Sequence, residues 1–298
     1  QAEPEESSTP EPTPVPTRNA PRRPSQERTR NIDTFQVTDW RKGRLLGAGS
    51  FGSVYKAQEL SQGRLFAVKQ ASVTEETLIQ KLQMEIDICR TLRHKNIVSY
   101  LGWERTAEHL CIFLEFVPGG SLQCVINNFG PLGETLAHKA IQGCLEGLNF
   151  LHSRSPPVVH RDIKCANILV DLNFNVKLAD FGCSKQADIT KSFTTIGSVP
   201  WMAPEVINGQ RGHGRKADIW SLGCTVIEMC TAQKPWGNQI FDNWFAALRH
   251  IGMTDELPSI PETVAGWIRT FILSCVCRDE DMRPACPELF DLLPRMNP

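Results

Sequence analysis

The apolar residues of this 298-residue chain change their spacing part-way along it, and this change most restricts the folds available. Between Phe35 and Ala71 they form short runs rich in β-branched and aromatic residues, separated by glycine-rich breaks, as in antiparallel strands. After Gly119 and Gly120 they recur mostly at three- and four-residue intervals, as in amphipathic helices. A small β-rich lobe is therefore predicted to precede a larger α-rich lobe.

The spacing also predicts individual elements. Strands are predicted over residues 40–46, 53–60 and 64–70, and a helix is predicted to begin at 74–77. Further helices are predicted over 136–152, 217–231, 240–251 and 264–277. Because the strands and the helices fall in separate parts of the chain, we predict an α+β fold with two lobes.

Composition excludes several classes of function. Lys and Arg number 32 against 33 Asp and Glu, so the chain has no overall attraction for nucleic acid. No run approaches the roughly 20 apolar residues that a membrane span needs, so membrane insertion is not expected. We expect a soluble protein of the cytoplasm, and we expect it to be part of a longer chain because it begins with Gln1.

The 11 cysteines favour a reducing compartment rather than a disulfide scaffold. Cys275 and Cys277 have no second pair at zinc-ligand spacing, so they are predicted to be core thiols. Six others lie within apolar stretches, where a free cysteine behaves as a small apolar residue: Cys89, Cys111, Cys124, Cys144, Cys224 and Cys230.

Residues 1–33 form a tail of different composition. The tail holds seven of the 20 prolines and almost no apolar residue, so we expect it to be disordered. Its first half is acidic, and five arginines follow between Arg18 and Arg30. A solvated linker is the simpler interpretation. Binding of regulatory partners or phosphorylation is the alternative, since Thr9 and Thr13 precede prolines and Ser25 follows two arginines and a proline.

A glycine-rich motif lies between two of the predicted strands. It consists of Gly47, Ala48, Gly49, Ser50, Phe51, Gly52, Ser53 and Val54. Dinucleotide-binding folds place such a motif between a strand and a helix, which this chain lacks here. The setting therefore favours a hairpin whose backbone approaches phosphate groups closely, which glycine permits.

Charged residues with a defined order follow this motif. Lys69 ends an apolar strand, and Glu85 lies on or beside the apolar face of the next helix. The run His160-Arg161-Asp162-Ile163-Lys164-Cys165-Ala166-Asn167 comes later, followed by Asp180-Phe181-Gly182 and by Met202-Ala203-Pro204-Glu205. In this order and spacing, the chain from Phe35 to its end resembles the eukaryotic protein kinase family.

The resemblance implies ATP and Mg²⁺ as cofactors and assigns roles to these residues. Asp162 would accept the proton of the attacking hydroxyl, Lys164 would neutralise charge on the transferring group, and Lys69 fixed by Glu85 would hold phosphates. Asn167 and Asp180 would bind Mg²⁺. The nucleotide would contact the glycine-rich loop from Leu46 to Val54, and also Ala67, Leu114, Glu115, Val117 and Leu169.

The resemblance also implies domain boundaries and structural residues. The kinase N-lobe would cover 34–118 and the C-lobe 119–298, with a hinge at 113–120. Asp218 would brace the catalytic loop, and Arg283 would pair with Glu205. Four side chains would stack to link the lobes: Cys89, Tyr100, His160 and Phe181.

Lys164, two residues after Asp162, is typical of kinases that act on serine and threonine. Several stretches, such as 116–122 and 178–185, are similar to MAP kinase kinase kinases of the MEKK type, which implies a MAP kinase kinase as the protein substrate. Germinal-centre and p21-activated kinases share much of this sequence and remain an alternative. A pseudokinase scaffold is a further alternative, which the presence of all the catalytic side chains disfavours.

Three candidate regulatory residues lie in the activation segment: Thr194, Thr195 and Ser198. Ser198 is expected to contact both Asp162 and Lys164. Because Arg161 directly precedes Asp162, a phosphate on Thr194 or Thr195 is predicted to pair with its guanidinium and to order the segment.

Overall fold

The computed structural model describes residues 29–31, 39–49, 52–74, 76–181, 185–186, 196–209, 213–237 and 244–295. Four predicted site residues or candidate regulatory residues, Ser50, Phe51, Thr194 and Thr195, lie outside the described residues, as do Cys183 and residues 1–28 of the tail.

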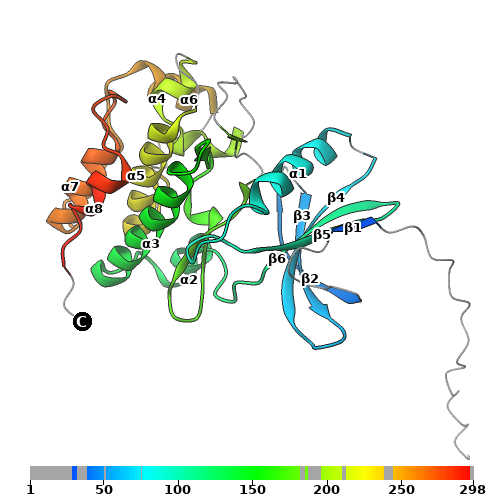
Figure 1. Ribbon diagram of the computed structural model, residues 1–298. Coiled ribbons are helices and arrows are strands. Elements are labelled where there is room, and N and C mark those ends of the chain that lie inside the picture. Colours follow the sequence, from blue (N-terminus) through cyan, green and yellow to red (C-terminus); the bar gives the residue numbers. More distant parts are fainter. Residues whose placement is uncertain are drawn as a thin grey trace, which may run out of the picture.

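The smaller lobe is built on one antiparallel sheet of six strands in the order β1-β5-β6-β4-β3-β2 (Figure 1). The strands are β1 (Thr29–Asn31), β2 (Trp40–Gly49), β3 (Gly52–Glu59), β4 (Leu65–Ser72), β5 (Tyr100–Arg105) and β6 (His109–Glu115). Helix α1 (Glu76–Cys89) connects β4 to β5. The three strands and the helix predicted in this region are confirmed, with ends that differ by a few residues.

Both faces of this sheet are covered by side chains. On one face, the rings of Trp40, Phe66 and Phe113 meet edge to face, with centroids 5.4 to 6.1 Å apart. On the other face, Leu82 and Ile86 of α1 are buried in the main core together with Ile112. Successive side chains of a strand point to opposite faces, so one face of the sheet packs the aromatic cluster and the other face packs helix α1.

Strand β1 was not predicted. The prediction of disorder is wrong for Thr29–Asn31, which pair antiparallel with β5. Three polar residues give no hydrophobic pattern, so composition cannot reveal a strand that forms through main-chain pairing with an existing sheet edge.

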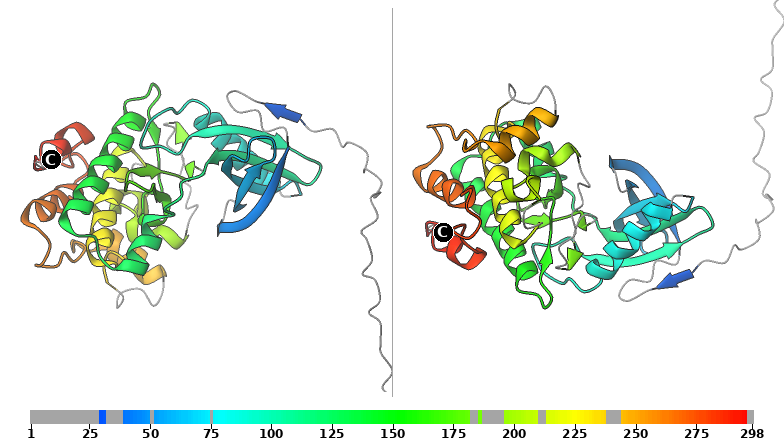
Figure 2. Two further views of the ribbon diagram at one scale, coloured as in Figure 1. Left: turned by 90° about the horizontal axis from the view of Figure 1, so that it is seen from below. Right: turned by 90° about the horizontal axis from the view of Figure 1, so that it is seen from above.

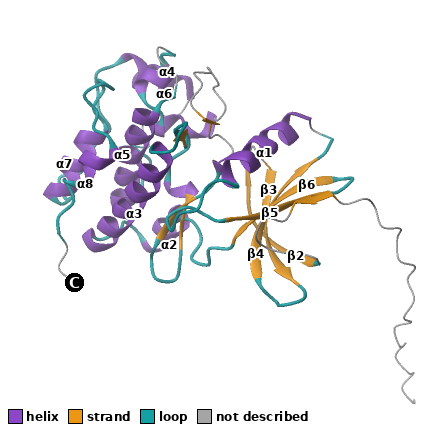
Figure 3. Cartoon of the chain, viewed as in Figure 1, coloured by secondary structure: helices purple, strands orange, loops and turns teal. Residues whose placement is uncertain are grey.

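The larger lobe is mainly helical, as Figure 3 shows by the separation of helices and strands. Its helices are α2 (Leu122–Phe129), α3 (Glu134–His152), α4 (Pro204–Ile207), α5 (Arg215–Thr231), α6 (Trp244–Met253), α7 (Gly266–Cys275) and α8 (Cys286–Phe290). Helix α5 is buried along most of its length, and α3 and α7 pack against it (Figure 2). The helices predicted over 136–152, 217–231 and 264–277 are confirmed with small shifts. In the described part, the helix predicted over 240–251 begins at Trp244.

Short elements on the side that faces the smaller lobe carry the candidate site. The hairpin of β8 (Ile168–Val170) and β9 (Val176–Leu178) follows a 3₁₀ turn, Cys165–Asn167. Strand β7 (Val158–Val159) pairs with β10 (Lys185–Gln186), and a second 3₁₀ turn covers Ile196–Trp201.

The ten cysteines in the described part of the chain are all free thiols. Burial of Cys89, Cys111, Cys144 and Cys224 is confirmed, whereas Cys124 is exposed. The prediction for Cys124 is wrong because Leu122 and Ile126 supply the buried side of α2, and Cys124 lies between them on the outer side. No helix among the described residues is long and apolar enough to cross a bilayer.

Candidate active site

Lys69 links β4, helix α1 and the segment that follows β9. Its amine on β4 lies 2.6 Å from Oε2 of Glu85 on α1 and 2.7 Å from Oδ1 of Asp180, which follows β9. Burial alone would lower the pKa of Lys69, but attraction by Glu85 and Asp180 outweighs it and raises that pKa. Lys69 is therefore a fixed cation, and its predicted pairing with Glu85 is confirmed.

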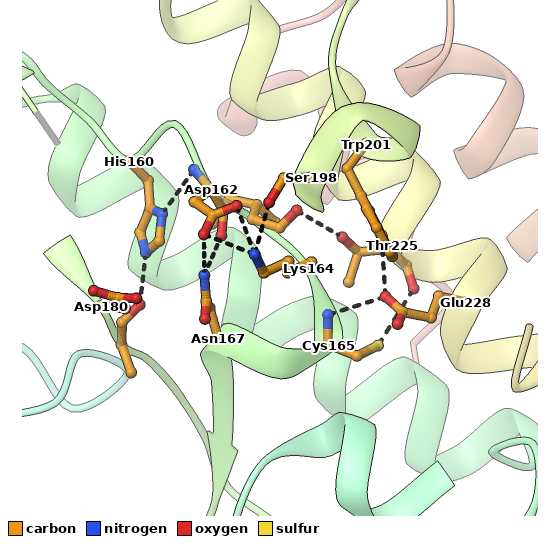
Figure 4. A network of polar contacts seen from close by, with 12 residues as sticks. His160, Asp162, Lys164, Cys165, Asn167, Asp180, Ser198, Trp201, Thr225 and Glu228 are labelled. Carbon is orange, nitrogen blue, oxygen red and sulfur yellow. Dashed lines mark hydrogen bonds and ion pairs between the residues drawn. The ribbon is translucent and has the colours of Figure 1, made fainter. Parts of the chain in front are cut away.

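Asp162, Lys164 and Asn167 form one hydrogen-bonded group, shown in Figure 4. The Lys164 amine lies 3.0 and 2.9 Å from the two carboxylate oxygens of Asp162. The Asn167 amide donates to Oδ2 of Asp162 at 2.6 Å and to its backbone carbonyl at 2.9 Å. The 3₁₀ turn at Cys165–Asn167 brings Asn167 back to Asp162, so the six residues from Asp162 to Asn167 form a compact site.

His160 connects this group to the segment that carries Asp180. Its Nδ1 accepts the Asp162 N–H at 3.3 Å, so Nε2 carries the proton and donates to the Ala179 carbonyl at 3.1 Å. Burial lowers the pKa of His160, which keeps the ring neutral as this arrangement requires. The ring also contacts Phe181, with centroids 5.0 Å apart, as expected for two of the side chains that link the lobes.

Asp218, in the first turn of α5, binds the backbone of the predicted catalytic loop, which runs from His160 to Asn167. Its carboxylate accepts the N–H groups of His160 and Arg161, each at 2.8 Å, which confirms the predicted bracing. His152 of α3 also lies 2.9 Å from this carboxylate. Burial would raise the pKa of Asp218, but the hydrogen bond from His152 and the nearby His213, whose Nε2 lies 3.5 Å from Oδ1, outweigh burial and lower that pKa strongly. Arg161 has a φ of 71°, a strained backbone conformation that these bonds stabilise.

The segment Ser198–Trp201 is held against the catalytic loop. Ser198 accepts a hydrogen bond from Lys164 at 2.7 Å, which confirms one of its two predicted contacts, while no hydrogen bond between Ser198 and Asp162 is found among the described residues. Lys164 instead bridges the two side chains, because its amine has donors for both.

A buried carboxylate on α5 supports the same segment. Oε2 of Glu228 accepts the backbone N–H of Cys165 and the indole N–H of Trp201, both at 3.0 Å (Figure 4). Burial raises the pKa of Glu228 against the effect of these hydrogen bonds. Sequence reasoning missed Glu228, His152 and His213, because a polar residue in an apolar helix shows no partner until distant segments are brought together.

The glycine-rich motif forms the hairpin between β2 and β3, with Gly49 opposite Gly52. Gly52 has a φ of 112°, and a Cβ there would lie 2.4 Å from the Gln70 carbonyl, so only glycine fits. The predicted hairpin is confirmed. Across the sheet, Val54 pairs with Lys69 and Ala67 pairs with Leu114, which places these predicted nucleotide contacts beside the fixed cation.

The hinge offers hydrogen-bonding groups to a nucleobase. Val117 is buried, and its N–H makes no hydrogen bond to another described residue. The Glu115 N–H donates to the Ser99 carbonyl at 2.9 Å, so the backbone group of Glu115 predicted to bind a base is its carbonyl. Gly119 donates to Val170, which fixes the hinge to β8 and to the predicted contact Leu169.

Comparison with known proteins accords with this geometry. Residues 40–292 match the model of the protein kinase domain. The chain belongs to the protein kinase family. Curated relatives include mitogen-activated protein kinase kinase kinase 2 of Arabidopsis thaliana, which is 43% identical over 274 residues. Others are ANP1 of the same plant, at 44% over 270 residues, and mitogen-activated protein kinase kinase kinase A of Dictyostelium discoideum, at 42% over 259 residues.

These alignments cover 84 to 87% of this protein kinase chain but only 27 to 41% of each relative. The chain thus spans less than half the length of these relatives, and the shared part is the kinase domain.

Asn167 and Asp180, the predicted ligands of Mg²⁺, lie on segments that are hydrogen-bonded to each other. Asn167 donates through Nδ2, which leaves its Oδ1 available as a ligand. The Ala179 N–H donates to the Asn167 carbonyl at 2.9 Å, which holds the neighbouring Asp180 beside the loop. One or two protein oxygens together with phosphate oxygens suit Mg²⁺, so these residues fit the metal.

A buried ion pair between Arg283 and Glu205 stabilises the larger kinase lobe. Arg283 donates to both carboxylate oxygens of Glu205, at 2.8 and 3.2 Å, and its guanidinium is completely buried. The predicted pair is confirmed. It anchors α4, which directly follows the segment Ser198–Trp201, to the C-terminal part of the chain.

Proposed function

We propose that this chain is an active serine/threonine kinase that uses ATP and Mg²⁺. The observation that carries the proposal is the pair of contacts that Lys69 makes with Glu85 and Asp180, formed beside an intact group of Asp162, Lys164 and Asn167. A scaffold that only binds partners has no need of this charge arrangement.

In the proposed reaction, the hydroxyl oxygen of the acceptor bonds to the γ-phosphorus while the bond to the β–γ bridging oxygen breaks and ADP leaves. Asp162 accepts the hydroxyl proton and aligns the nucleophile. Lys164 compensates charge on the transferring group, and Lys69 holds the phosphates. Bound Mg²⁺ would neutralise phosphate charge, with Asn167 and Asp180 as its protein ligands.

The contacts of Lys164 support specificity for serine or threonine. Lys164, two residues after Asp162, contacts both Asp162 and Ser198, as expected from the resemblance to kinases that act on serine and threonine.

We further propose that the substrates are MAP kinase kinases and that the protein acts in the cytoplasm. The names of these relatives support the choice of substrate, and the free thiols of the described residues suit a reducing compartment. Phosphorylation of Thr194 or Thr195, paired with Arg161, remains the proposed activating step. The double variant Thr194→Ala, Thr195→Ala should lose most of the activity, and full activity in that variant would exclude the step.

The substrate proposal is tested with catalytically inactive MAP kinase kinases and a generic basic protein, each incubated with the chain and Mg²⁺-ATP. The expected result is phosphate on serine or threonine of the MAP kinase kinase activation loops. Phosphate on the generic protein alone would keep the kinase and exclude the cascade assignment, whereas ATP binding without any transfer would favour a scaffold.

A further inference from the structure

Strand β5 would be the outer strand of the sheet if β1 were absent. An outer strand presents unpaired N–H and C=O groups, to which an extended peptide can add. Here β1 occupies that position, with Thr29 opposite Arg105, Arg30 opposite Glu104 and Asn31 opposite Trp103. The kinase-domain match begins at residue 40, so this strand is an addition from outside the family domain.

The register of this pairing opposes a basic residue to an acidic one. Glu104 is 1% exposed, and the indole N–H of Trp40 donates to its Oε2 at 3.1 Å. A buried carboxylate is stabilised by a nearby cation, and opposite charges at directly opposed positions stabilise antiparallel strands. The register puts Arg30 at the opposed position. None of the three residues of β1 is apolar, so burial of apolar surface does not explain the pairing.

The short connection between β1 and β2 favours the chain's own tail as the segment that pairs with the edge of β5. Eight residues separate Asn31 from Trp40, where β2 begins. A short tether of this kind gives an effective concentration on the order of millimolar, which a separate peptide must exceed. A strand of only three residues is weakly held by itself, so the pairing is reversible.

We propose that the outer edge of β5 is a docking site for an extended basic peptide and that the tail segment Thr29–Asn31 is its occupant. The tail is thereby attached to the smaller lobe, on the edge of the sheet opposite β2 (Figure 1). Ser25 lies four residues before β1, and a phosphate near this basic segment weakens docking by reducing its positive charge.

Hydrogen exchange in the full chain tests the docking. Successive N–H groups of a strand point to opposite sides, so the double variant Thr29→Pro, Arg30→Pro removes at least one donor toward β5. The matched control is Gln26→Pro, Glu27→Pro, in the tail but outside the strand. We expect exchange of β1-facing amides in 100–105 to become about tenfold faster in the strand variant only. Equal exchange in the original chain and both variants would overturn the proposal.

A peptide added in trans tests the occupant. A synthetic peptide of residues 24–35, supplied in millimolar excess to the strand variant, is expected to restore slow exchange in 100–105. The same peptide with Arg30→Glu is the control and is expected to give no protection. If the first peptide gives no protection, β5 is not a docking site, and if both peptides protect equally, the edge does not select a basic segment. Neither outcome depends on catalysis, so the test is independent of the proposed kinase activity.

Discussion

The amine of Lys69 lies 2.6 Å from Oε2 of Glu85, and both side chains are almost completely buried. The two residues belong to different elements, β4 and α1, so their contact fixes the helix against the sheet at the level of the catalytic loop. The same amine also contacts Asp180 in the larger lobe. Lys69 therefore links the helix and the sheet of the smaller lobe to a residue of the candidate active site in the larger lobe.

Replacement of Glu85 should impair catalysis more than folding. Glu85→Gln removes the charge that orients Lys69, so kcat/KM with respect to ATP is expected to fall at least about tenfold. The matched control is Glu59→Gln, because Glu59 is another buried carboxylate of the smaller lobe and pairs with Arg64 at 2.7 Å, away from the site. Steady-state kinetics measure kcat/KM for ATP in both variants. An equal decrease in kcat/KM in the two variants would show that Glu85 has no special role in catalysis.

Replacement of Arg283 should destabilise the larger lobe. Arg283→Met leaves the buried carboxylate of Glu205 without its cation, which costs about 3–5 kcal/mol of unfolding free energy. Arg90→Met is the control, since Arg90 and its partner Asp87 are both about half exposed and such pairs contribute about 0.5 kcal/mol or less. Chemical denaturation measures both values. A loss of less than 1 kcal/mol for Arg283→Met would contradict the account.

Lys177 should affect the nucleotide through the hinge. Its amine lies 3.0 Å from Oε1 of Glu115, whose Oε2 accepts the Ser99 N–H at 3.1 Å. Lys177→Met frees this side chain, and we expect KM for ATP to change about two- to threefold with little change in stability, because the pair is partly exposed. Lys95→Met breaks the more exposed Lys95–Glu146 pair and is the control. An unchanged KM in the Lys177 variant would show that the pair does not position the hinge.

Asp218 should contribute stability that depends on pH. Its pKa in the folded protein is lowered, so its contribution is fully present above the unfolded value of about 3.9 and is lost as the pH falls below that value. The difference in unfolding free energy between the original chain and Asp218→Asn is therefore expected to be constant from about pH 6 to 8 and to shrink below about pH 4. Denaturant titrations at several pH values provide the measurement. A difference that grows toward acid pH would contradict the assignment.

The residues that could be predicted from sequence are those whose chemical type the reaction requires in a fixed order. Lys69, Asp162 and Asp180 are recognisable because they lie in the motifs by which the chain resembles the protein kinase family. The contacts of Glu228 and His152 could not be predicted, since their partners lie on other segments and spacing alone does not distinguish them from exposed polar residues.

The same limit applies to the elements. Helices with a regular apolar face were predictable to within a few residues, whereas β1 depends on pairing with β5 rather than on its own composition. Cys124 shows a smaller error of the same kind, because an apolar neighbourhood in sequence does not determine which side of α2 a residue occupies.

Phosphate transfer from Mg²⁺-ATP by the original chain and by Asp162→Asn tests the central claim most directly. The variant keeps the shape of the side chain and removes its capacity to accept the hydroxyl proton. The account predicts phosphoserine or phosphothreonine with the original chain, and a rate at least about 100-fold lower with the variant at unchanged ATP affinity. Equal rates for both, or no transfer by the original chain despite ATP binding, would contradict it.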